Sequence, residues 1–219
     1  RNVSREAMLE RVRENGDALM TCTNQAFRND KEIVMVAVRT GRDALLWASD
    51  RLRKDGDVIL EAVAHNGRAL RYAYAFRDSK EIVLQACKVD GNALQFASSE
   101  LRSDVKVASV AVEQTPYALQ YCGKNVQNNY DIVLKAVEQD GMTIRCASKN
   151  LKGNFDIGMA ACKNNPAALK YLALNVQQKV AVTLSRNLYE FDHVETAEEP
   201  KALDSFLAYF DIVELSQGR

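Results

Sequence analysis

Apolar residues along the chain fall into two blocks that recur together every 24 to 26 residues. The first block pairs a small residue with a branched one, as at Ala136 and Val137, and the second places an aliphatic residue three positions after a Gly or Pro. That aliphatic column is filled in every copy, by Leu19, Leu45, Leu70, Leu94, Leu119, Ile144 and Leu169. Spacings of three and four are typical of helices, and a fixed period of this length indicates a repeat protein.

Polar residues mark where the helices begin. Three residues before the first apolar position of each first helix, such as Ile132, stand Ser4, Asp30, Asp55, Ser79, Asp104, Asn129 and Asn154. All are N-cap residues, whose side-chain oxygens accept hydrogen bonds from the free N–H groups of a first helical turn. A second set of capping residues stands just before the corner between the two helices of each copy. The set is Asn15, Gly41, Asn66, Asp90, Thr115, Asp140 and Asn165, and the corner residues that follow are Gly16, Arg42, Gly67, Gly91, Pro116, Gly141 and Pro166. Pro shares the corner column with Gly because the first helical position tolerates Pro.

The pattern therefore predicts seven pairs of short helices. We expect about ten residues in the first helix of each pair, about nine in the second, and a linker of about three or four residues after it. Helices this short are marginal alone in water, so stacking must stabilise them, and the first helix should bury a block such as residues 132–137 between its neighbours. The predicted fold is all-α, an α-solenoid (superhelix) of helix-turn-helix repeats.

The two ends depart from the pattern. Arg11 replaces the usual Ala, which indicates an uncovered face, and an Arg at residue 1 suggests a fragment or a processed chain. We expect the repeat array to span residues 4–178 and a separate segment to span residues 179–219. That segment should hold a degenerate helix over 179–187, an acidic loop over 188–200 and a C-terminal capping helix over 201–215, which covers the last repeat or docks onto a partner.

Segments such as DKEIVMVAV, SKEIVLQACKVDGNALQFAS and YDIVLKAVEQDGMTIRCAS resemble the repeats of the domain-of-unknown-function 4116 family. The resemblance runs from residue 4 to residue 177. It implies an α-helical repeat, often within larger proteins of protists, large viruses and bacteria that deliver effectors into host cells. It implies no known reaction, and it carries over no catalytic residue.

Composition narrows the function. Lys plus Arg equals Asp plus Glu at 29 each, so no global charge favours nucleic acid or an anionic membrane, and no run of 18 apolar residues predicts a membrane helix. The five cysteines lie in apolar or small columns, at Cys22, Cys87, Cys122, Cys146 and Cys162. An odd number of such residues indicates buried free thiols in a reducing compartment, the cytoplasm or, for a delivered effector, the host cytosol. No catalytic, metal-binding or cofactor motif is present, so we expect no enzyme, no metal and no cofactor.

The columns that vary between repeats are the candidate binding surface. Four residues after the corners come Met20, Leu46, Arg71, Gln95, Gln120, Arg145 and Lys170, which should form one row along the array. The alternative to a binding role for this row is an ordinary solvated face. The next column holds Trp47, Tyr72, Phe96, Tyr121 and Tyr171, which serve either as aromatic anchors or as core.

Three functions remain open. The favoured one is a non-catalytic scaffold that binds a protein or peptide along this surface. The second is RNA binding through Arg71, Arg145 and Lys170 with stacking aromatics, which the zero net charge disfavours. The third is a targeting or spacer segment of a larger protein. The pattern leaves the partner and the oligomeric state open.

Overall fold

The computed structural model describes residues 3–191, and the side chains of residues 3–185. These residues form helices and no strand, so the fold is the predicted all-α solenoid of repeats. The chain divides into two compact units, Arg1–Gly123 and Lys124–Arg219, of which residues 3–123 and 124–191 are described. Each predicted N-cap begins a helix of ten residues. These long helices are α1 (Arg5–Glu14), α3 (Lys31–Thr40), α5 (Gly56–His65), α6 (Lys80–Val89) and α8 (Val105–Gln114) in the first unit, and α10 (Tyr130–Gln139) and α12 (Phe155–Asn164) in the second.

The capping residues act as the sequence predicts. Asp104 Oδ1, for example, accepts from the backbone N–H groups of Lys106 and Val107 at 2.9 and 3.0 Å. Six of the seven predicted caps of the long helices make such a bond, and Ser79 does not. The local sequence therefore sets where each long helix starts.

The second helix of each pair differs from the prediction. It is a six-residue 3₁₀ helix rather than an α-helix of about nine residues: η1 (Gly16–Thr21), η3 (Gly67–Tyr72), η5 (Gly91–Phe96) and η6 (Pro116–Tyr121) in the first unit, η7 (Gly141–Cys146) and η8 (Pro166–Tyr171) in the second. The second repeat has α4 (Ala44–Trp47) there instead. A 3₁₀ helix has three residues per turn, and the buried residues Gly91, Leu94 and Ala97 are spaced by three.

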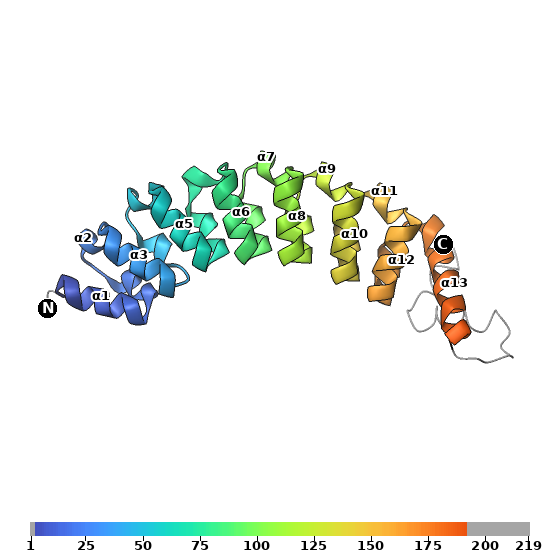
Figure 1. Cartoon of the computed structure of the whole chain (residues 1–219), viewed down its shortest axis with the longest axis horizontal. Coiled ribbons are helices and arrows are strands. Elements are labelled where there is room, and N and C mark those ends of the chain that lie inside the picture. Colours follow the sequence, from blue (N-terminus) through green and yellow to red (C-terminus); the bar gives the residue numbers. More distant parts are fainter. Residues whose placement is uncertain (1–2, 192–219) are drawn as a thin grey trace, which may run out of the picture. The chain divides into compact units, whose positions relative to one another are not determined.

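The predicted linker also holds a short helix. These helices have three or four residues each: α2 (Gln25–Arg28), η2 (Leu52–Lys54), η4 (Tyr74–Phe76), α7 (Ser99–Arg102), α9 (Lys124–Gln127) and α11 (Lys149–Lys152). The first six repeats thus have three helical elements each. In the first unit the long helices stack in chain order, α1 on α3, α3 on α5, α5 on α6 and α6 on α8, and the 3₁₀ helices pack beside them (Figure 1).

Corner glycines allow the two layers to approach closely. A Cβ on Gly91 would lie 2.1 Å from the backbone oxygen of Ala111, which belongs to the long helix of the next repeat. Gly67 faces the Ala86 oxygen in the same way, at 2.3 Å, and Gly141 faces the Ala161 oxygen at 2.1 Å. The Gly column and the Ala column of the sequence are therefore two sides of one contact.

The end of the described chain corrects two predictions. The structure has one helix, α13 (Leu174–Phe191), where the sequence predicts a helix over 179–187 and a loop from residue 188. Lys179 stands at the position that Asn154 occupies one repeat earlier, and it offers no capping oxygen. The short helix and the long helix consequently continue as one. The predicted capping helix over 201–215 and the rest of the acidic loop lie outside the described residues, so the separate segment 179–219 stays a prediction.

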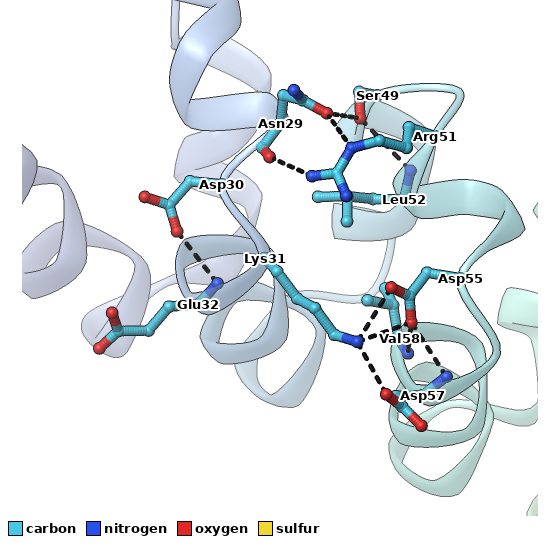
Figure 2. A network of polar contacts seen from close by, with 10 residues as sticks. All are labelled: Asn29, Asp30, Lys31, Glu32, Ser49, Arg51, Leu52, Asp55, Asp57 and Val58. Carbon is cyan, nitrogen blue, oxygen red and sulfur yellow. Dashed lines mark hydrogen bonds and ion pairs between the residues drawn. The ribbon is translucent and has the colours of Figure 1, made fainter.

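Polar contacts connect neighbouring repeats. Lys31 donates to Asp55 and Asp57 of the next long helix at 3.0 and 2.7 Å, while Asp55 also caps that helix (Figure 2). Asn29 accepts from Ser49 and Arg51 at 2.7 and 2.9 Å. Arg5 pairs in the same way with Asp30, and Lys80 with Asp104. In each case the cation lowers the pKa of the capping carboxyl.

Candidate functional site

The predicted row of varying side chains lies at the fifth residue of the 3₁₀ helices. Arg71 and Gln120 are exposed, whereas the Gln95 side chain folds back and donates to the Asn92 carbonyl at 3.0 Å. Because η3 packs on η5 and η5 on η6, these three residues lie on consecutive elements of the first unit. Arg145 and Lys170 are exposed at the equivalent positions of η7 and η8 in the second unit.

The aromatic column at the sixth residue is largely covered. Tyr72 is buried, and its hydroxyl donates to Asp43 at 2.9 Å. Burial, and then the bond to Asp43, raises the pKa of Tyr72. Half-buried side chains occupy the rest of the column, at Trp47, Phe96, Tyr121 and Tyr171. Cations cover some of these rings, with Arg71 over Tyr72 at 4.5 Å and Arg28 over Trp47 at 5.4 Å from the ring centre.

A basic column that the sequence analysis missed stands two residues before the caps of the long helices. It consists of Arg28, Arg53, Arg77, Arg102 and Lys152. Arg28 donates to the Met20 carbonyl at 3.1 Å and Arg77 to the Arg71 carbonyl at 2.9 Å, and Lys152 reaches the Arg145 carbonyl at 2.7 Å. These bonds satisfy carbonyls near the ends of the 3₁₀ helices. A constant offset from the caps is the signal that identifies this column.

A hollow in the first unit lies on the long helices α3, α5 and α6. We call it the long-helix groove. Its volume is about 610 Å³, and its lining comprises Met35, Asp57, Leu60, Glu61, Ala64, Glu81, Leu84, Gln85 and Lys88. Met35, Leu60 and Leu84 occupy the same position of three successive helices and are all half-buried. The sequence predicts that the whole apolar block of each long helix is buried between its neighbours. That prediction is wrong for these three residues and for Leu134 in the second unit, which are only half-buried.

The rim of the groove carries both signs of charge. Asp57 accepts from Lys31 at 2.7 Å and Glu61 from Arg39 at 2.6 Å, so both carboxylates are already paired. Glu81 has no ion pair among the described residues, and Lys88 stands two turns further along the same helix. An apolar floor inside a polar rim is the usual composition of a protein–protein interface.

Reactive side chains lie elsewhere. Burial raises the pKa of Cys87 and of Cys162 to about 12, so both thiols stay protonated at neutral pH. Burial also raises the pKa of Cys146, which is half-buried. Within residues 3–191 no group of three or more His, Cys, Asp or Glu side chains is arranged to hold a metal ion. No helix in that part of the chain is long and apolar enough to cross a membrane.

Comparison with known proteins relates the repeats to one family. The family model described as "Domain of unknown function (DUF4116)" matches residues 4–53, 30–77, 79–127 and 129–175. No curated protein and no solved structure matches the chain. The matches cover most of the repeat array, and the number of repeats agrees approximately with the seven that the sequence predicts. The chain therefore belongs to the family defined by this domain of unknown function, DUF4116.

Proposed function

We propose that the protein is a non-catalytic scaffold that binds a segment of a partner protein in the long-helix groove. The observation that carries this proposal is the row formed by Met35, Leu60 and Leu84. Each is half-buried on its own helix, and all three line the groove. Stacked helices lie about 8–10 Å apart, so the row suits the apolar side chains of an elongated ligand.

The energetics favour a protein segment. Burying one such apolar side chain contributes roughly 1.5–3 kcal/mol, so a segment that inserts several of them offsets part of the cost of association. The paired carboxylates Asp57 and Glu61 at the rim can accept hydrogen bonds from a peptide backbone while they keep their cations. RNA binding has less support, because the basic column donates to backbone carbonyls and positions 95 and 120 are neutral.

A capture experiment tests the proposal. The full chain, the double variant Leu60→Gln with Leu84→Gln, and a control variant Val105→Gln are used as bait, with and without ribonuclease. Val105 is a suitable control because it is a 47% exposed apolar residue outside the groove. We expect the full chain and the control variant to capture a partner protein whether or not ribonuclease is present, and the groove variant to lose it. A partner that the groove variant retains in full would overturn the proposal.

A further inference from the structure

The third repeat is shorter than those that follow it. Its corner Gly67 precedes the next corner, Gly91, by 24 residues, whereas the later intervals are 25. The missing residue falls in the segment between η3 and α6, where the short helix η4 has only three residues. At the start of that segment Ala73 has a ψ of 58°, while Ala97 at the same position of the next repeat has a ψ of 162°.

This shortening changes how two repeats join. At the neighbouring steps a backbone N–H donates to the carbonyl of the basic column, Ser49 to Arg28 at 2.8 Å and Ser98 to Arg77 at 2.7 Å. Within the described residues, no equivalent bond joins Tyr74 to Arg53. A pocket of about 240 Å³ lies beside this step, lined by Asp50, Arg53, Lys54, Tyr72, Tyr74 and Ala75. We call it the tyrosine pocket.

Two cations line the tyrosine pocket, and two more lie over its tyrosine rings. Arg53 and Lys54 form part of its lining, and the guanidinium groups of Arg71 and Arg77 lie over the rings of Tyr72 and Tyr74 at 4.5 and 4.4 Å. Tyr74 is 66% exposed, unusually so for a large side chain. Asp50 is the one carboxylate in the lining, and it pairs with Arg53. Among the described residues Lys54 makes no contact ion pair, but it acts on Asp50 at longer range: Arg53 first, and then Lys54, lowers the pKa of that carboxyl.

From this arrangement we propose that the tyrosine pocket binds a carboxylate side chain of an acidic peptide segment. The volume suits one side chain, and the lining carries two cations, Arg53 and Lys54, against one carboxylate, Asp50. The incoming carboxylate pairs with Lys54 and competes with Asp50 for Arg53, while the segment's backbone lies against the exposed face of Tyr74. This site goes beyond the groove, which lies on other elements and has an apolar floor.

A protein ligand fits better than nucleic acid because most cations of the basic column are bound to backbone carbonyls, Arg28 to Met20, Arg77 to Arg71 and Lys152 to Arg145. In the row that contains Arg71, the next two positions of the unit are Gln95 and Gln120. A phosphate backbone carries regularly spaced charges and needs a track of cations along the array. An acidic segment needs only one strong anchoring point, so a local cluster suffices.

The test is a fluorescence-anisotropy titration of the full chain with a labelled hexaglutamate peptide, at about 50 mM salt so that screening is limited. A hexaglutamine peptide is the control ligand, and the variants are Lys54→Glu, Asp50→Asn and, as a control, Lys106→Glu at an exposed lysine of α8. We expect hexaglutamate to bind about tenfold tighter than hexaglutamine, and Lys54→Glu to weaken it by about tenfold. Lys106→Glu should leave binding unchanged.

Asp50→Asn gives the sharpest outcome, since removing the competing carboxylate should tighten hexaglutamate binding severalfold. A gain of affinity cannot come from a variant that fails to fold. Equal binding of the two peptides, weaker binding by Asp50→Asn, or tighter binding of a hexauridylate RNA than of hexaglutamate would each overturn the proposal. The groove variant Leu60→Gln with Leu84→Gln should bind hexaglutamate normally, so failure of one proposal is distinguishable from failure of the other.

Discussion

Replacing Gly91 by Ala should destabilise the array, because the corner has no room for a methyl group. The added Cβ would lie 2.1 Å from the Ala111 oxygen and 2.9 Å from the Cβ of Thr115. Carbon–oxygen contacts in proteins are about 3.3–3.6 Å, so η5 and α8 would have to separate by more than about 1 Å. Overpacking of this kind costs roughly 1–3 kcal/mol, which exceeds the roughly 0.4–1 kcal/mol that Gly→Ala gains by restricting the unfolded chain.

Gly56→Ala is the matched control, since Gly56 is also the first residue of a helix in the same unit. Nothing lies within 4 Å of a Cβ built there. We expect Gly56→Ala to raise the free energy of unfolding by up to about 1 kcal/mol and Gly91→Ala to lower it. Urea denaturation followed by circular dichroism measures both, with the slope m confirming that the same surface unfolds. If Gly91→Ala is as stable as Gly56→Ala, the close approach of the layers is not what the Gly column provides.

Three further predictions concern the ion pairs between neighbouring repeats, the last helix and the thiols. Lys80 lowers the pKa of Asp104 below 3.8 in the folded protein. The stability that this pair contributes is therefore present above that pH and is lost as the pH falls through the lower, folded pKa. The difference in melting temperature between wild type and Lys80→Met should shrink in acid, and a constant difference would contradict this. Replacing Gln178 by Gly and Lys179 by Asn copies the Gly153–Asn154 pair, and should divide α13 into two helices, detected as loss of helical Cα chemical shifts at those residues; unchanged shifts would contradict it. Cys146 should react with a thiol reagent before Cys87 and Cys162, because it is less buried; simultaneous labelling of the native protein would contradict this.

Much of the fold follows from local chemistry. Side chains such as Asp104 and Asn154 cap their own helices, so the starts of the long helices are visible in the sequence. The 3₁₀ helices were not predicted, although buried residues at intervals of three, as at Gly91 and Leu94, carry that signal. Six-residue 3₁₀ helices are uncommon, and here tertiary packing of the corner on the next repeat stabilises a geometry that propensity does not favour.

The candidate surfaces were harder to predict. An apolar column in the sequence does not tell which edge a neighbouring layer covers, so Leu60 and Leu84 looked like core although they line the groove. The charge of Arg77 similarly says nothing of its bond to the Arg71 carbonyl. The tyrosine pocket lies beside the step at which one residue is missing between Ala73 and Ser79, a change that alters the spacing of the repeats but not their hydrophobic pattern.

The most direct test of the scaffold function is site-specific photo-cross-linking in cells that make the protein. A photoreactive benzoylphenylalanine replaces Leu60 in the groove or, as the control, Ser99, an exposed residue of α7. We expect position 60 to cross-link to one partner, through a peptide with several apolar residues, and position 99 not to cross-link to it. Equal cross-linking at both positions, or cross-linking at position 99 alone, would contradict it.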